Sequence, residues 1–158
     1  MKGEEARWRL RETVVLWHVH EASASDIVYA ACDVVVAGVD GPAVVALAAA
    51  SARWAEEEVG ELVDDAVREV GFTPAGGAAI EQALCLLATR AVAGTMTPPD
   101  FAAWADVWCG FDTPLAERLV ALCREYDVLE YPSEARYEVD ARVLAEARRL
   151  AAEWFSAR

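Results

Sequence analysis

Hydrophobic residues recur along most of the chain at spacings of three and four, which is the period of an α-helix. Gly, Pro, Ser and Thr interrupt this pattern at regular intervals, as they do where helices stop and start. The residues of 13–20 favour a sheet, but no second strand pattern could pair with them, so a helix is expected there and a strand is the alternative. The sequence predicts an all-α fold of about eight helices, at 4–22, 23–37, 42–50, 54–70, 77–94, 98–109, 114–126 and 133–156.

The segment 77–94 is apolar on most sides. On a helix, Ile80, Leu84 and Leu87 share one face, while Leu86 lies on another. A surface helix of a soluble domain would carry more polar residues. We therefore predict that the other helices pack around this central buried helix in one irregular bundle, and that 1–158 is a single domain.

Two helix junctions have the same spacing. Gly38 and Pro42 are matched 56 residues later by Gly94 and Pro98. Gly is common just after a helix and Pro at its first position, so ordinary helix junctions explain the match. The alternative is an internal duplication of a three-helix unit, over 25–70 and 77–126.

The segment 27–50 is nearly all apolar and has the length of a membrane span. Asp33, Asp40 and the Gly41-Pro42 step divide it into pieces shorter than the roughly 20 residues that a bilayer core requires. Two buried helices joined by a turn are therefore expected. Because the N-terminal segment is charged and has no apolar signal core, we expect a cytoplasmic protein that does not contact a membrane.

The chain is acidic, with 14 basic and 27 acidic residues and a net charge of −13. Affinity for nucleic acids comes largely from Lys and Arg that neutralise phosphates, so direct nucleic-acid binding is not expected. A basic protein is the partner that this charge would favour.

The predicted helix 54–70 carries seven acidic residues and one internal base. Glu57, Glu61 and Asp65 are four residues apart, a spacing at which like charges weaken a helix. With Asp64, these residues are candidates for binding a basic partner. A merely solvated helix face is the alternative.

Phe101, Trp104 and Trp108 form an aromatic stripe on the predicted helix 98–109. Packing in the core is the default for such a stripe. If it were exposed, it would be a candidate surface for a protein partner or for a homodimer.

Residues with metal-binding or catalytic chemistry are scattered. On a helix His18 and His20 would point apart, and the four cysteines lack any short spacing, so reduced buried thiols are expected and neither metal nor cofactor is expected. A buried Asp33 could have a catalytic role, but an exposed or arginine-paired carboxylate is the simpler interpretation. No catalytic residue is assigned.

Several segments resemble small uncharacterised all-helical proteins of actinobacterial type. They are GVDGPAVVALA at 38–48, EVG at 69–71, AVAG at 91–94 with Pro98, Trp104 with Trp108, and EVDAR at 138–142. The resemblance implies an all-helical fold but no activity and no functional residue.

The strong negative charge and the lack of a catalytic motif favour one of two functional hypotheses. The favoured hypothesis is an acidic protein-interaction module, for example an immunity or inhibitor-like protein that binds a basic partner. The alternative is an enzyme or small-molecule sensor with a pocket between helices.

Overall fold

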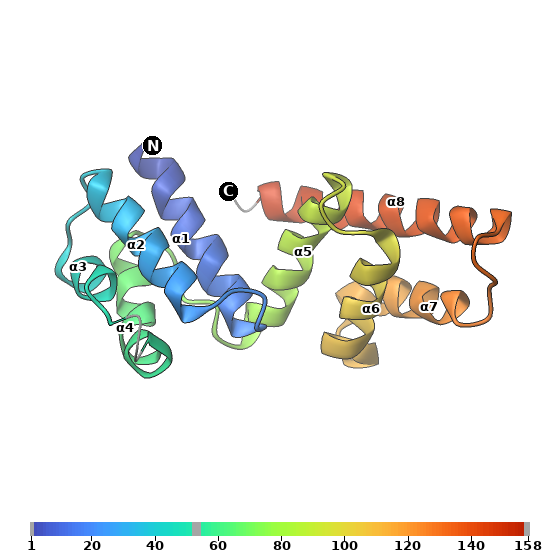
Figure 1. Ribbon diagram of the computed structural model, residues 1–158, viewed down its shortest axis with the longest axis horizontal. Coiled ribbons are helices and arrows are strands. Elements are labelled where there is room, and N and C mark those ends of the chain that lie inside the picture. The colour runs from blue at the N-terminus through green and yellow to red at the C-terminus, as the bar shows by residue number, and fades with distance from the viewer. Residues whose placement is uncertain (1, 52–54, 157–158) are drawn as a thin grey trace. The chain divides into compact units, whose positions relative to one another are not determined.

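The computed structural model describes residues 2–51 and 55–156. No described residue lies in a strand, so the all-α prediction is confirmed, and the segment 13–20 belongs mainly to the first helix. The predicted start at Trp54 lies outside the described residues. The helices are α1 (Gly3–His18), α2 (Ala24–Val36), α3 (Pro42–Ala48), α4 (Ala55–Glu69), α5 (Ala79–Val92), α6 (Pro98–Trp108), α7 (Glu117–Tyr126) and α8 (Glu134–Ser156) (Figure 1).

Three short 3-10 segments, Gly76–Ala78, Gly110–Asp112 and Pro114–Ala116, accompany these helices. The chain divides into two compact units, Met1–Ala79 and Ile80–Arg158. Helices α1 to α4 form the first unit, and α5 to α8 form the second almost entirely. The prediction that 1–158 is a single domain stays a prediction.

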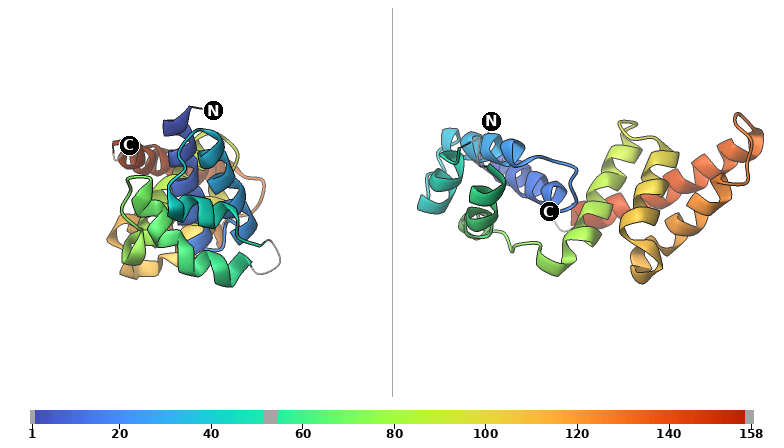
Figure 2. Two further views of the ribbon diagram at one scale, coloured as in Figure 1. Left: turned by 90° about the vertical axis from the view of Figure 1, so that its left-hand side faces the viewer. Right: turned by 60° about the horizontal axis from the view of Figure 1, so that its bottom comes forward.

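In the first unit, α2 packs against α1, α3 and α4. Figure 2 shows α1 and α2 side by side, with α3 and α4 packed next to them. The core between these helices is built from residues with helical spacing. It includes Leu10, Ile27, Val34, Leu47 and Val63, all fully or almost fully buried.

The start of α2 has the cap that its sequence indicates. The Ser23 hydroxyl accepts a hydrogen bond from the backbone N–H of Asp26 at 3.2 Å, and the Asp26 carboxylate accepts one from the backbone N–H of Ser23 at 2.8 Å. These reciprocal bonds satisfy two backbone donors that a helix start leaves open. The Ser23 hydroxyl also donates a hydrogen bond to the Asp26 carboxylate at 2.7 Å. This bond and the one from the Ser23 backbone N–H lower the pKa of Asp26, because they favour its charged form.

In the second unit, α6, α7 and α8 contact one another. The predicted burial of the segment 77–94 is confirmed for most of α5, in which residues 83–88 are all buried. Helix α8, the longest at 23 residues, runs beside α7 (Figure 1). At its start, the Ser133 hydroxyl accepts a hydrogen bond from the backbone N–H of Arg136 at 3.2 Å, as a helix cap does.

The two matched junctions have the same local geometry. Gly38 and Gly94 both adopt left-handed backbone conformations, with φ of 86° and 77°. A residue with a Cβ is strained in that region, which explains glycine at both helix ends. Pro42 and Pro98 then begin α3 and α6. Because a common capping rule accounts for both junctions, the internal duplication stays a prediction.

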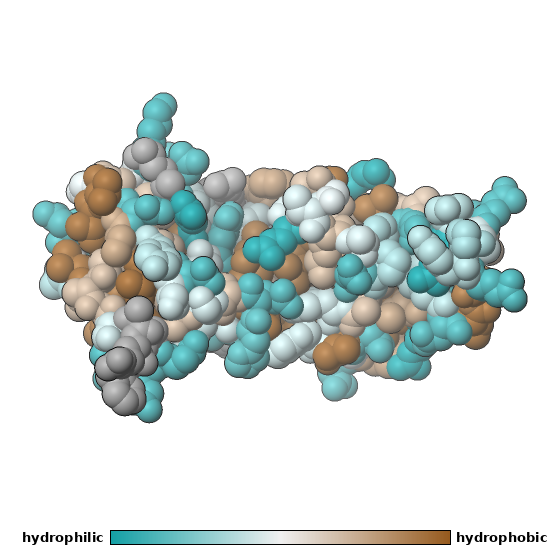
Figure 3. All heavy atoms as spheres, in the orientation of Figure 1, coloured by the Kyte–Doolittle hydropathy of each residue, from teal (hydrophilic) through white to brown (hydrophobic). Residues whose placement is uncertain are grey.

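Within the described ranges, no helix has the length and apolar character needed to cross a membrane. The apolar segment 27–50 forms α2 and α3, two helices joined by a turn, as predicted. Some of its side chains remain at the surface. Figure 3 shows apolar side chains over the end of α2 and over α3, where Val36 and Val45 are exposed.

Candidate functional sites: an acidic helix face and an arginine-lined groove

The seven carboxylates of α4 fall into two groups, and the first group has structural partners. Glu69 accepts a hydrogen bond from the backbone N–H of Val44 at 2.7 Å, in the first turn of α3. Gly41, which precedes α3, allows this approach because a Cβ at that position would overlap the Glu69 carboxylate. An anion is stabilised at a helix N-terminus, so Glu69 acts as a remote cap of α3.

Glu56 and Glu58 complete the first group. Glu56 accepts hydrogen bonds from the Trp17 indole N–H at 3.1 Å and from the backbone N–H of Ala24, the first residue of α2, at 3.4 Å. Glu58 accepts one from the backbone N–H of Ser51 at 2.7 Å. These carboxylates satisfy donors that would otherwise depend on water, and Glu56 places negative charge at the start of α2.

The second group contains the four residues predicted to bind a partner, and all four are exposed. Asp65 forms an ion pair with Arg68 at 2.8 Å, one turn along the same helix, where both side chains face water. Such exposed pairs contribute little to stability. Among the described residues, the side chains of Glu57, Glu61 and Asp64 make no hydrogen bond or ion pair. The structure therefore leaves these three carboxylates available.

The aromatic stripe of α6 is mostly interior. Phe101 is 0% exposed and Trp104 is 7% exposed. Trp108 is half-buried and stacks on Trp104, with 6.2 Å between ring centroids. Phe101 and Trp104 therefore have the core positions that were the default interpretation, and the partner or homodimer role considered for an exposed stripe stays a prediction. Core packing accounts for the stripe.

His18 and Asp33 lie on different helices, α1 and α2. His18 ends α1, and His20 follows the helix with a φ of 58°. In the part of the chain that the structure describes, no group of three or more His, Cys, Asp or Glu residues could hold a metal ion. Asp33 forms an ion pair with Arg9 at 2.9 Å, which is the arginine-paired state considered for it.

The four cysteines are reduced. Cys85 and Cys109 are buried, whereas Cys32 and Cys123 are half-buried. Burial raises the pKa of the Cys85 and Cys109 thiols to about 11. Their thiolate forms are scarce near neutral pH, so these two residues behave as small hydrophobic side chains.

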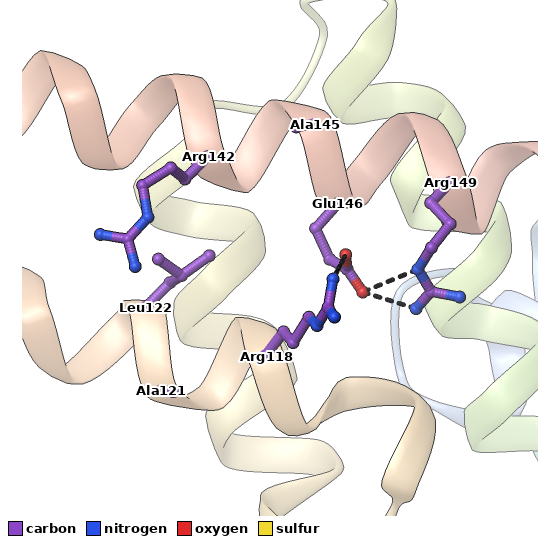
Figure 4. Close-up of a pocket in the computed structure, with 7 residues that line it drawn as sticks. All are labelled: Arg118, Ala121, Leu122, Arg142, Ala145, Glu146 and Arg149. Carbon is purple, nitrogen blue, oxygen red and sulfur yellow. Dashed lines mark hydrogen bonds and ion pairs between the residues drawn. The ribbon is translucent and has the colours of Figure 1, made fainter.

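A groove between α7 and α8 was not anticipated from the sequence. It encloses about 540 Å³, a volume within the range of small-molecule sites. Both of its walls belong to the second unit. Its lining residues are Arg118, Ala121 and Leu122 from α7, and Arg142, Ala145, Glu146 and Arg149 from α8 (Figure 4).

Glu146 is the charged centre of one end of the groove. Glu146 is only 6% exposed, although it carries a carboxylate. Arg149 donates two hydrogen bonds to one carboxylate oxygen, from Nε at 3.0 Å and from Nη2 at 2.5 Å. These bonds raise the pKa of Arg149 and offset part of the cost of burying the carboxylate.

Arg118 faces the other oxygen of Glu146 from α7. Its Nη1 lies 3.9 Å from that oxygen, which is too far for a hydrogen bond (Figure 4). The Arg118 side chain is 80% exposed. Its guanidinium is therefore held near the groove by charge attraction, while its N–H donors remain open to solvent or to a ligand.

Arg142 lies at the other end of the groove. Its guanidinium donates two hydrogen bonds to Glu125 of α7, at 2.6 and 2.9 Å, and this pairing raises the pKa of Arg142. Ala121 of α7 and Ala145 of α8 also line the groove (Figure 4). Two small side chains leave space there, and Leu122 supplies an apolar wall.

A second hollow of about 310 Å³ adjoins the groove and shares Arg118, Glu146 and Arg149 with it. Pro114, Leu115 and Glu117 line its other side. The sequence does contain a signal for this site, because Arg142, Glu146 and Arg149 follow one another at spacings of four and three on one helix face. The sequence does not show, however, that this face of α8 packs against α7.

No protein-family model, curated protein or solved structure matches this chain. The resemblance to actinobacterial helical proteins therefore stays a prediction.

Proposed function

We propose that this protein is an acidic interaction module that binds a basic protein through the exposed face of α4. One observation carries the proposal. Glu57, Glu61 and Asp64 are exposed and have no cation or donor among the described residues. On the same helix, Glu56 and Glu69 are used to cap other helices.

Glu57 lies in the first turn of α4, where the helix dipole favours a negative charge, but the like charges further along this face oppose the helix. Glu57, Glu61 and Asp65 stand at successive four-residue spacings, where each like-charged pair costs about 0.2–0.5 kcal/mol. A basic surface placed against this face would replace that repulsion by attraction. The net charge of −13 would also speed the encounter with a basic partner.

An immunity or inhibitor-like protein is the class that this arrangement suits. Such a protein covers a basic surface, for example that of a nuclease, and needs no catalytic group of its own. In this proposal the encounter takes place in the cytoplasm.

The proposal can be tested by capturing partners from a lysate of the source organism at low salt. The wild type is compared with Glu57→Lys/Glu61→Lys, which changes the net charge by +4. The matched control is Asp112→Lys/Glu130→Lys, which makes the same change at two exposed positions of the second unit. We expect a basic protein to be retained by the wild type and the control and to be lost by the α4 variant.

The control separates a specific face from general charge attraction. If both variants lost the partner equally, net charge alone would govern retention and α4 would have no special role. If both retained it fully, the partner would use another surface. Either result contradicts the proposal.

A further inference from the structure

Beyond the α4 face, we infer that the groove between α7 and α8 is a binding site for a small organic anion. The ligand would carry one carboxylate or phosphate group on a short apolar body. Its anionic group would lie against Arg118, and its body against Leu122 and the two alanines of the groove. Three features of the groove support this site: open donors, available space and a cation without a hydrogen-bonded carboxylate.

The open donors belong mainly to Arg118. Its guanidinium makes only the 3.9 Å approach to Glu146 and keeps its hydrogen-bonding groups available. Arginine binds carboxylate and phosphate groups well because its planar fork can donate two parallel N–H bonds to them. Arg149, whose side chain is about half exposed, has a remaining Nη1 donor beside the same space.

The space is a consequence of residue size. Ala121 and Ala145 line the groove, one on each helix, and longer side chains at these positions would occupy part of it. Leu122 gives the same region an apolar wall. A ligand with a short hydrocarbon body would remove this apolar surface from water, at about 25 cal/mol for each Å².

The hydrogen bonds of the groove leave one of its arginines without a bonded carboxylate. Three arginines and one glutamate line the groove. Arg149 is hydrogen-bonded to Glu146, and Arg142 is hydrogen-bonded to Glu125. Among the described residues, Arg118 makes only the 3.9 Å approach to Glu146. A small anion is therefore attracted to Arg118 at short range, while distant acidic residues are screened by salt.

The inference is tested by NMR titration of the ¹⁵N-labelled full-length protein at constant ionic strength. The probes are inorganic phosphate, butyrate and monobutyl phosphate. We expect saturable shifts centred on the backbone amides of Ala121 and Ala145. Monobutyl phosphate should bind more tightly than inorganic phosphate if the apolar wall takes part. The comparison of butyrate with monobutyl phosphate shows which anionic group the groove prefers.

Three variants connect the shifts to the groove. Arg118→Gln should weaken binding about tenfold or more, because a charge-assisted hydrogen bond is lost. Ala145→Leu keeps every charge but fills the space, and should abolish saturation. Arg148→Gln removes a neighbouring exposed arginine that does not line the groove, and should bind as the wild type does.

The outcomes are decisive in both directions. The inference is overturned if none of the three probes gives saturable shifts in the folded wild type. It is also overturned if Arg118→Gln and Arg148→Gln weaken binding equally, because the anion would then respond to charge alone. A folded Ala145→Leu variant that binds like the wild type would place the ligand elsewhere. None of these results bears on the α4 face.

Discussion

The α4 face and the α7–α8 groove use charged residues in opposite ways. On α4, Glu57, Glu61 and Asp64 face water without a cation among the described residues. In the groove, Glu146 and Glu125 are each bonded to an arginine. The difference shows that the acidity of the chain has two components: carboxylates that the fold needs, and carboxylates that remain available to a partner.

The unit that contains α4 is also the more negative of the two units. The first unit has 6 basic and 14 acidic residues, a net charge of −8, whereas the second has 8 basic and 13 acidic residues, a net charge of −5. The excess of the first unit lies largely on α4, where seven acids accompany Arg68. On net charge alone, a basic partner is therefore expected to approach the first unit.

The largest difference in unfolding free energy is expected between a substitution of Glu146 and a substitution of Glu61. Glu146→Ala removes a buried carboxylate that accepts two hydrogen bonds, and should cost about 1–3 kcal/mol of unfolding free energy. Glu61→Ala removes an exposed carboxylate without a partner, and should change stability by less than about 0.5 kcal/mol. Urea unfolding followed by circular dichroism measures both. Equal costs would mean that the two regions do not differ in their use of charge.

The next largest effect on stability is expected between the capping carboxylate and an exposed carboxylate of α4. Glu69→Gln weakens the remote cap of α3, and Gly41→Ala displaces the same carboxylate from Val44. Each should cost about 1–2 kcal/mol. Asp64→Asn, on the exposed face, is the control and should cost less than about 0.5 kcal/mol.

A double mutant tests whether Gly41 and Glu69 act through one interaction. If both substitutions remove the same hydrogen bond, the unfolding free energy of the double variant should be only slightly below that of the less stable single variant. Fully additive costs would show that Gly41 has a role unrelated to the Glu69 carboxylate.

The smallest effect should be a gain in stability. Glu61→Lys replaces the repulsion of Glu57 and Asp65 with attraction at both four-residue spacings, and should stabilise α4 by about 1 kcal/mol at low salt. The gain should fade at 1 M salt, where the Debye length is about 3 Å. Thermal unfolding at the two salt concentrations measures it. A loss of stability at low salt would show that Glu61 has a structural role.

The sequence predicted the helices well because their signals are local. Ser23 with Asp26, Ser133, and the Gly38–Pro42 junction act within a few residues, and the structure confirms each of them at a helix end. Burial of α5 was also predictable, since its apolar residues surround most of the helix. These features depend on periodicity and capping, which can be read along the chain.

The contacts that were missed join distant residues. Glu56 caps a helix 32 residues before it, Glu69 caps one 25 residues before it, and Arg142 pairs with a glutamate 17 residues away. Charge spacing on one helix does not reveal which partner helix lies opposite. For the same reason, the sequence alone could not separate the structural carboxylates of α4 from the exposed ones, and it did not indicate the groove.

The aromatic stripe illustrates the same limit. The spacing of Phe101, Trp104 and Trp108 places them on one face of α6, and a face of this kind is compatible with either a core or a surface. The structure decides for the core at Phe101 and Trp104, which are buried. Of the two candidate partner surfaces, the α4 face is therefore the more accessible one.

The association rate of the purified basic partner tests the central claim most directly. The rate is measured for the wild type, for Glu57→Lys/Glu61→Lys and for the control Asp112→Lys/Glu130→Lys, between 0.1 M and 1 M salt. Electrostatic attraction acts mainly on the association rate and is screened as the Debye length falls from about 10 Å to about 3 Å. We predict that the α4 variant associates more slowly than the control at 0.1 M and that the difference disappears at 1 M. Equal rates for the two variants at 0.1 M would contradict the proposal that α4 receives the partner.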